Sequence, residues 1–346
     1  MAKSNAAIVS KALTMYGRRL KQEDWESLLN CKSVPEAAAY LKANTVYGDV
    51  LADIQESNIH RGELEDLLRT KLTRDVARLS IYDRNVGKGV GHFLIGMQEI
   101  RMVMRNIVRV DAHRPTPAYS AAPLLRDSSR LNIYGLEQAT TFAQIMEALK
   151  GSAYYKKVEP FYPADGDFKD YTGLENALYT DLYNALYDAV EHHSTPIARQ
   201  QLHGMLDDYI DLENYSRILR LKSYYHVPDQ KIRQCLLPFG SISKKKLLEM
   251  ATADTTQQVT AIMGTTRVGK RTLRFMEDTA DQLKLVVRYK DAHKNLVFST
   301  QSGVVMLSYV YVMDTEMQAL IHLIEGIRYK IPPAQIRRLL SPYHFL

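Results

Sequence analysis

The residues closest to a recognised chemical motif run from Gly264 to Arg271, with the sequence GTTRVGKR. A glycine, four residues and Gly-Lys form the first part of the loop that holds the phosphates of a bound nucleotide. The next position should supply a hydroxyl for Mg²⁺, but it is Arg271, and Thr272 comes one place late. The surrounding pattern is helical, and no second strand ending in a metal-binding Asp is evident. We therefore expect no nucleotide site here; the alternative, ATP binding, would be lost in Lys270→Ala.

Other groups that could do chemistry are weaker. The glycine-rich pentad Gly87 to Gly91 follows no strand pattern, and we interpret it as a turn into a helix from Phe93 to Val110. His192 and His193 point to different sides of a helix, and no carboxylate or thiol completes a set at metal-ligand spacing. No nucleophile elbow, His-Glu metal motif or convincing carboxylate pair is evident. The sequence predicts no catalytic residue, no metal and no cofactor.

Clustered Lys and Arg residues are the candidate contacts with partners. The first group is a row with a spacing of four along a predicted helix. The second opens the segment KKKLLEM. The third lies within GTTRVGKR and in the few residues after it. Such clusters suit acidic protein surfaces or lipid headgroups, whereas a basic stripe without aromatic stacking residues is a weak sign of nucleic-acid binding. The candidates are Arg101, Arg105, Arg109, Lys244, Lys245, Lys246, Arg267, Lys270, Arg271 and Arg274.

The elements that would position these residues are helices, so we predict an all-α fold. Leucines at spacings of four from Leu174 to Leu186 indicate one helix, and Ser33 with Glu36 predicts an N-cap and its reciprocal partner. A helix from Thr195-Pro196 to about Tyr225 would be roughly 40 Å long and would join two units as a strut. The expected helices include 6–20, 23–29, 93–110, 174–190 and 196–225.

A pattern of helix, short joint and helix occurs twice at one constant offset. Between Asp211 and Pro238 a long helix reaches a tyrosine pair and Pro228 starts a second helix; EMQALIHLIEGIRYKIPPAQIRRLLSP repeats this near the C-terminus. The matched positions are Tyr225, Pro228, Ile232, Arg233, Leu236 and Pro238 with Tyr329, Pro332, Ile336, Arg337, Leu340 and Pro342. A weaker copy places Pro117 on Pro228, and residues 10–29 hold a degenerate fourth. We infer three tandem helical units, 1–110, 111–225 and 226–346.

Composition agrees with a cytosolic helical protein. Among 346 residues, 46% are hydrophobic and 24% charged, which excludes disorder as the main state. Cys31 and Cys235 are expected to be reduced thiols, and no signal peptide is evident. The apolar part of Leu296 to Met313 is about half the length that crosses a bilayer, so we expect a soluble chain that reaches a membrane only through a partner. The net charge of +6 is compatible with nucleic acid, anionic lipid or an acidic protein as a partner, and it does not distinguish among them.

Taken in order, several segments resemble one family, the C subunit of bacterial and archaeal V-type (A-type) rotary ATPases, which is the counterpart of the d subunit in the eukaryotic vacuolar enzyme. The resemblance covers nearly the whole chain and lies in order, spacing and repeat, because none of the segments is a catalytic signature. The segments are SKALTMYGRRLKQEDWESLLNCKSVPEAAAYLKANTVYGDVL, IHRGELEDLLR, ENYSRILRLKSYYHVPDQKIRQCLLPFGSIS and EMQALIHLIEGIRYKIPPAQIRRLL.

The resemblance implies an all-helical funnel of three similar subdomains around a pseudo-threefold axis. It also implies a non-catalytic rotor subunit that receives the central stalk, subunits D and F, and sits on the cytoplasmic face of the membrane proteolipid ring. Two other hypotheses stay open at this stage: a free-standing helical-repeat scaffold for protein or nucleic acid, and a P-loop nucleotide-binding protein. The order of the repeats favours the rotor subunit over both.

Overall fold

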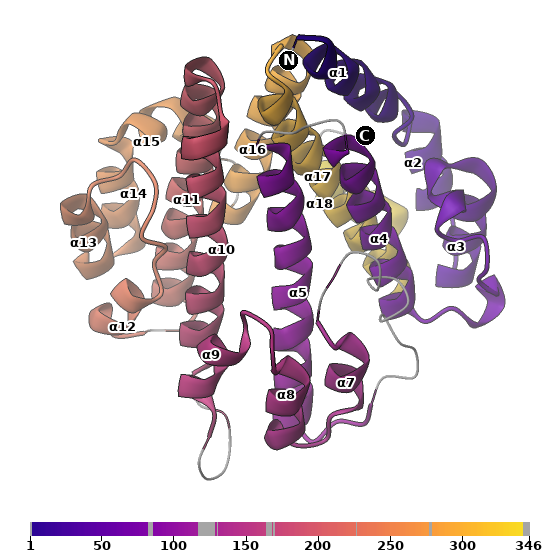
Figure 1. Cartoon of the computed structure of the whole chain (residues 1–346), viewed down its shortest axis with the longest axis horizontal. Helices are drawn as coiled ribbons and strands as arrows, with labels where there is room; N and C mark the ends of the chain where they lie inside the picture. Colours follow the sequence, from indigo (N-terminus) through magenta and orange to yellow (C-terminus); the bar gives the residue numbers. More distant parts are fainter. Residues whose placement is uncertain are drawn as a thin grey trace. The chain divides into compact units, whose positions relative to one another are not determined.

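The computed structural model describes residues 2–81, 86–116, 129, 131–163, 168, 170–225, 227–276 and 279–341 (Figure 1). Every regular element in these ranges is a helix, which confirms the predicted all-α class. The chain forms two compact units: unit 1 comprises Met1–Ile95, Tyr119–Ser129 and Tyr289–Leu346, and unit 2 comprises Gly96–Ala118 and Arg130–Arg288. The three tandem repeats stay a prediction from the sequence.

Unit 1 is built from helices at both ends of the chain. The predicted N-cap at Ser33 is confirmed for the helix that begins at Val34, because Ser33 Oγ accepts a hydrogen bond from Glu36 N (3.3 Å). The Glu36 carboxylate accepts one from Lys32 N (2.7 Å), one residue before the N-cap, and not from Ser33 N as a reciprocal cap would. The elements of unit 1 are α1 (Ala2–Gly17), α2 (Gln22–Leu29), α3 (Val34–Asn44), η1 (Val46–Asp49), η2 (Glu56–Asn58), α4 (Arg61–Ser80), the first part of α5 (Gly87–Asp111), the second part of α16 (Ala280–Phe298), α17 (Ser302–Arg328) and α18 (Pro333–Leu340).

The core of unit 1 forms around α17. Helices α1 and α4 pack against it most extensively, and α2, α3 and α18 also contact it. Of the described helices, α17 is long and apolar enough to cross a membrane by length and composition, but 89% of its most apolar stretch is buried inside the unit. We therefore interpret α17 as a core helix. It begins at Ser302 and continues well beyond Met313, so the apolar segment noted in the sequence is its first half.

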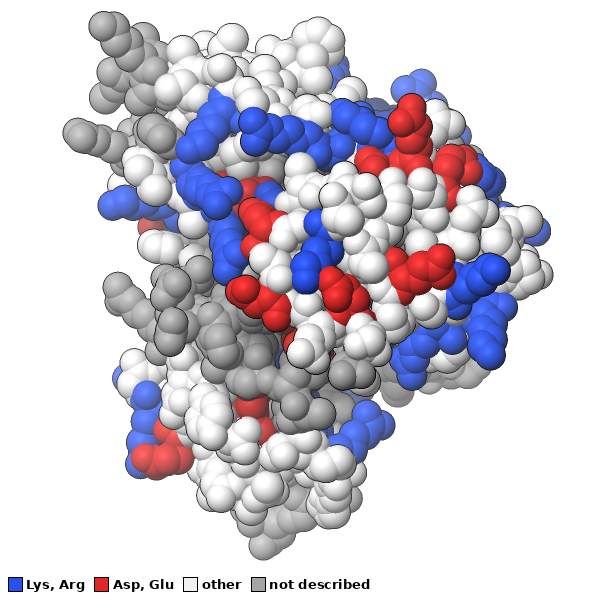
Figure 2. Space-filling view, turned by 90° about the vertical axis from the view of Figure 1, so that its right-hand side faces the viewer, with Lys and Arg blue, Asp and Glu red and all other residues white. Residues whose placement is uncertain are grey.

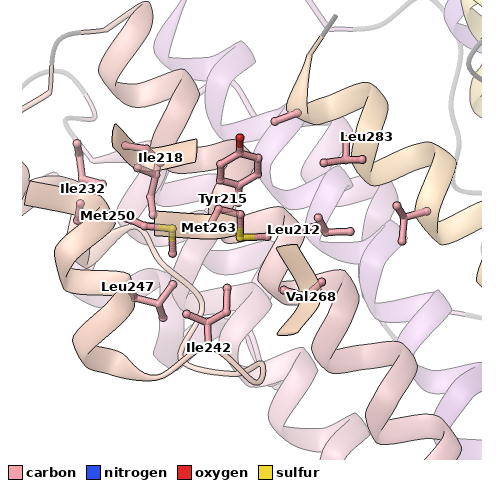
Figure 3. Close-up of a cluster of buried hydrophobic side chains, with 14 residues drawn as sticks. Leu212, Tyr215, Ile218, Ile232, Ile242, Leu247, Met250, Met263, Val268 and Leu283 are labelled. Atoms are coloured by element: carbon pink, nitrogen blue, oxygen red, sulfur yellow. The ribbon is translucent and has the colours of Figure 1, made fainter. Parts of the chain in front are cut away.

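Unit 2 contains the middle of the chain. One apolar cluster is shared by the helices from α11 to α16, with Tyr215 at its centre and Leu212, Met263 and Leu283 around it (Figure 3). The elements are the second part of α5, α7 (Ile133–Gln138), α8 (Phe142–Leu149), α9 (Tyr155–Val158), η3 (Glu159–Phe161), α10 (Tyr171–His193), α11 (Pro196–Ser223), α12 (Asp229–Gln234), α13 (Lys244–Thr252), α14 (Thr256–Gly264), α15 (Arg267–Thr272), η4 (Leu273–Phe275) and the first part of α16.

The long helices test two predictions. The predicted long helix is confirmed as α11, which has 28 residues, lies wholly within unit 2 and is capped by Thr195, whose Oγ1 accepts a hydrogen bond from Ala198 N (3.2 Å). That it joins two repeat units as a strut stays a prediction. Helix α5 begins at Gly87, so the expected turn before Phe93 is wrong. Val86 and Val90 are both buried and carry the apolar side of the helix back across the glycines, which explains the earlier start.

The two matched joints have the same local structure. Pro228 precedes α12 with φ −57° and ψ 143°, and Pro332 precedes α18 with φ −56° and ψ 141°. In each joint the residue before the proline donates its N–H to a carbonyl in the last turn of the long helix, Val227 to Leu221 O and Ile331 to Gly326 O. Repetition of sequence thus corresponds to repetition of structure in these two joints. Pro117, at the matching place in the weaker copy, lies outside the described residues.

Candidate partner-contact site

Two of the basic groups predicted from the sequence meet in unit 2. Lys246 Nζ, in the first turn of α13, donates a hydrogen bond to Thr265 Oγ1, which lies between α14 and α15. This contact brings the lysines that open α13 next to the arginines of α15, although about 20 residues separate them in sequence. We call this group the basic cluster; it consists of Lys244, Lys245, Lys246, Arg267, Lys270, Arg271 and Arg274.

The positive charges of the basic cluster are used in different ways. Arg267 and Arg271 both form ion pairs with Asp208 of α11, whose side chain is only 10% exposed. Arg274 is exposed and lies over the ring of Phe275, 4.8 Å from its centre. Lys244, Lys245 and Lys270 are also exposed, and these three have no ion pair with any described residue. The cluster therefore has lysines available to a partner and arginines that anchor α15 to α11.

The arginines of α5 do not form the single exposed row that their spacing suggested. Arg101 is exposed, and Arg105 is half-buried, 3.7 Å from a carboxylate oxygen of the buried Glu137. Arg109 is only 9% exposed and donates hydrogen bonds to the carbonyls of Leu136 (3.1 Å) and Ala139 (2.7 Å) at the end of α7. Arg109 thus satisfies buried carbonyl groups inside unit 2, and we do not retain it as a partner contact.

Four polar side chains on α11 hold the segment that leads to the basic cluster. They are spaced three apart, and since such a row is inclined to the helix axis, it follows a chain segment that crosses the helix. We call this row the polar ladder; it consists of Asp208, Asp211, Asn214 and Arg217.

The central rungs of the polar ladder are fully buried. Asp211 accepts hydrogen bonds from Ser241 N (3.1 Å), Ser241 Oγ (2.6 Å) and Ile242 N (3.1 Å). Asn214 exchanges two hydrogen bonds with the backbone of Leu237, both 2.9 Å long. Gly240 has φ +101°, and a Cβ there would lie 2.3 Å from Asp211 Oδ1, so the turn requires glycine.

The last rung is part of a network of charges. Arg217 Nη1 donates to the carbonyl of Cys235 (2.8 Å), and its Nε donates to Glu213 (2.9 Å). Lys284 of α16 also contacts Glu213, at 2.6 Å. Burial alone would raise the pKa of Glu213, but Lys284 and Arg217 together lower it to about 2. This network attaches α16 to α11. Cys235, Leu237, Ser241 and Lys284 therefore contact α11 at successive points.

The segment that resembles a P-loop has a structural explanation. It is preceded by helix α14, whereas a P-loop follows a strand. Thr266 caps α15 by accepting a hydrogen bond from Gly269 N (2.9 Å), and a Cβ on Gly269 would lie 1.9 Å from Met263 O. Gly269 is thus needed for the close approach of α14 and α15. Among the described residues, no three His, Cys, Asp or Glu side chains are placed to hold a metal ion.

The polar ladder is not among the predicted site residues, although the sequence contains a signal for it. Asp208, Asp211 and Asn214 are spaced three apart in a helix whose other residues include many apolar ones. Polar residues that recur on the buried side of a helix indicate partners in the core, because a buried polar group without a hydrogen bond is costly. Their partners are mostly backbone groups of a non-helical segment, which sequence spacing does not reveal.

Comparison with known proteins places the chain in a family. Residues 8–339 match the model of the family described as ATP synthase (C/AC39) subunit. The C subunit of the A-type ATP synthase of Archaeoglobus fulgidus is 23% identical to this chain over 264 residues, which cover 75% of this chain and 73% of the relative. Because the family model matches nearly the whole sequence, the chain belongs to the ATP synthase (C/AC39) subunit family.

Proposed function

We propose that this protein is the non-catalytic rotor subunit that couples the central stalk of a V-type or A-type ATPase to its membrane proteolipid ring. The observation that carries the proposal is the family match over residues 8–339. In this role the chain binds stalk subunits D and F on one side and the ring on the other. It lies peripherally on the cytoplasmic face of the membrane, and it turns with the rotor during ATP-linked proton or sodium transport.

The internal structure of unit 2 supports a mechanical role. A subunit that transmits torque needs parts that do not slide past one another. Asp211, Asn214 and Arg217 attach the segment after α12 to α11 through hydrogen bonds, which are directional. Apolar contacts from α11 to α16 fill the space between these helices. This combination resists both separation and sliding.

The basic cluster is the proposed contact with an acidic partner surface. Lys244, Lys245 and Lys270 are exposed. Lys270 belongs to α15, which is anchored to α11 through Asp208, and Lys244 and Lys245 open α13 just after Ser241 and Ile242, whose backbone bonds to Asp211 of α11. Charges on a rigid support attract an opposite surface without losing much conformational freedom on binding. We expect the acidic surface to belong to the central stalk, because a protein partner supplies a fixed pattern of carboxylates.

Co-sedimentation of the purified chain with the stalk subunits of its own organism tests the proposal. The expected result at low salt is a one-to-one complex, with no saturable ATP binding by the chain alone. The combined variant Lys244→Glu, Lys245→Glu and Lys270→Glu should weaken the complex, and added salt should weaken the wild-type complex most.

A matched control separates a specific surface from overall charge. Lys156, Lys294 and Arg338 are exposed side chains that also lack an ion pair with any described residue. Their combined reversal to Glu changes the net charge by the same amount and should leave assembly intact. If both triple variants lose stalk binding equally, the basic cluster is not a specific part of the interface. Failure of the wild-type chain to bind the stalk at low salt, together with saturable ATP binding, would overturn the proposed function.

A further inference from the structure

Unit 1 contains a hollow of about 620 Å³, separate from the basic cluster and the polar ladder of unit 2. It lies between α1, η1, α4 and α17, so its walls come from four separate segments of the unit. Its volume is in the range of pockets that hold small molecules. Apolar and aromatic side chains form much of the lining, including Met15, Val46 and Met313. Such a lining suits the apolar part of a small ligand.

Four cationic side chains line the hollow. Lys11 is on α1, Arg18 directly follows the end of α1 at Gly17, and Lys71 and Arg78 are on α4. Lys71 and Arg78 are seven residues apart, which places both on one side of α4. Among the described residues that line the hollow, Asp49 and Asp75 bring negative charge, so four positive charges face two negative ones. The hollow therefore favours an anion.

The side of unit 1 on which α1, α2 and α3 lie carries much positive charge. Figure 2 faces this side and shows Lys and Arg side chains gathered in a curved band in its upper half. A band of one sign raises the local concentration of oppositely charged ligands. This band would therefore attract anions to unit 1.

The floor of the hollow is fixed by buried polar groups. Tyr309 Oη donates a hydrogen bond to Asp75 Oδ2 (2.9 Å), and Lys71 Nζ contacts the same oxygen (2.6 Å). Tyr47 Oη donates to Glu316 (3.1 Å). Asp75, Tyr309 and Tyr47 are each at most 3% exposed. These contacts position Lys71, whereas the side chains of Arg18 and Arg78 are exposed.

The two arginines differ in how far they are already engaged. Arg78 is 57% exposed and lies 3.8 Å from Asp75 Oδ1, a buried oxygen that has no hydrogen-bond partner among the described residues. Arg18 is exposed and forms no ion pair with any described residue. Guanidinium groups bind phosphate through paired N–H donors, and Asp75 Oδ1 offers an acceptor beside Arg78.

From this arrangement we propose that the hollow of unit 1 binds a small phosphate-bearing ligand, with Arg18 and Arg78 as its phosphate contacts. A ligand that also carries a hydroxyl or amino donor would match Asp75 beneath the arginines. A free phosphorylated metabolite and the headgroup of an anionic lipid share this chemistry. The proposal concerns the isolated chain and does not depend on the proposed rotor function.

Binding to the purified full chain tests the proposal by calorimetry with pyrophosphate and with glycerol 3-phosphate, and by co-flotation with vesicles that contain phosphatidylglycerol. Binding of either free compound indicates a metabolite site. Flotation with anionic but not with neutral vesicles, without binding of the free compounds, indicates a headgroup site. In either case Arg18→Glu should weaken binding by about tenfold or more. No binding in any arm overturns the proposal.

The chain offers a matched control on α4. Arg74 is exposed, does not line the hollow and forms no ion pair with any described residue. Arg74→Glu alters charge as Arg18→Glu does and should change the dissociation constant by less than about threefold. Arg78→Gln provides a second test if Arg18→Glu does not fold, since it removes the guanidinium without adding negative charge. Equal weakening by Arg74→Glu, or full binding by both hollow variants, refutes the site.

Discussion

Substitution of Asn214 by alanine is the most direct test of the polar ladder. The Asn214 side chain is completely buried; its Nδ2 donates to Leu237 O, and its Oδ1 accepts from Leu237 N, both at 2.9 Å. Alanine removes both partners at once and leaves the buried backbone of Leu237 with neither hydrogen bond. Asn214 is the uncharged member of the polar ladder. Substitution of Asp211 or Arg217 would also remove a charge, so its effect on stability would not report on the hydrogen bonds alone.

The expected loss of stability follows from the two unsatisfied groups. A buried donor or acceptor left without its partner costs about 1–3 kcal/mol. Two such groups would cost about 2–6 kcal/mol, and movement of the loop or entry of a water molecule brings the expected value to about 3 kcal/mol. For a cooperative unit of this size, that loss lowers the melting temperature by about 6–12 °C. If the two units unfold in separate transitions, the melting temperature should fall only for the transition of unit 2, which contains Asn214.

Urea unfolding followed by circular dichroism, together with calorimetry, measures this loss. Asn184→Ala on α10 is the matched control, since Asn184 is exposed and forms no side-chain hydrogen bond within the described part of the chain; it should change stability by less than about 0.5 kcal/mol. If Asn214→Ala were also within about 0.5 kcal/mol of the wild type, the claim that the ladder holds the segment after α12 would be refuted.

Two further predictions concern other sites. Gly269→Ala places a Cβ against Met263 O and should destabilise the chain by about 3 kcal/mol in urea, whereas Lys270→Ala should cost less than about 0.5 kcal/mol; the reverse order would contradict the helix-packing explanation of this segment. Burial raises the pKa of Glu316 from 4.5 to about 7, so the folded state retains a proton that the unfolded state releases, and stability should fall by about 3 kcal/mol as pH rises from 4.5 to 7. Glu316→Gln should remove most of that fall in urea unfolding at pH 5 and pH 8, and an unchanged pH dependence would show that another group causes it.

The helices were predictable because their signals are local. Thr195 and Pro196 mark the start of α11, and the matched prolines mark the joints after α11 and α17. Caps and prolines act through neighbouring backbone groups, so the sequence contains nearly all the relevant information. The start of α5 was predicted wrongly because glycines usually indicate a turn. Here the burial of Val86 and Val90 outweighs the low helix propensity of the glycines between and after them.

The candidate site was only partly predictable. A spacing of four places Arg101, Arg105 and Arg109 in a row, but each step of four residues advances about 40° around a helix with 3.6 residues per turn. Over eight residues the row turns by about 80°, which takes Arg109 into the core of unit 2. The basic cluster and the hollow of unit 1 depend on tertiary packing, which brings distant helices together, so no spacing within one segment indicates either of them.

Buried polar contacts such as the polar ladder would stiffen a subunit that transmits torque, which is the role proposed for this chain. An apolar seam between helices holds them together, but it opposes a small sliding motion only weakly, because dispersion contacts are not directional. Each rung from Asp208 to Arg217 fixes one point of the crossing segment by hydrogen bonds whose strength falls steeply with misalignment. Load applied to the exposed lysines of the basic cluster would therefore pass to α11 through several fixed points. Under the proposed function, weakening one rung should loosen coupling before it prevents assembly.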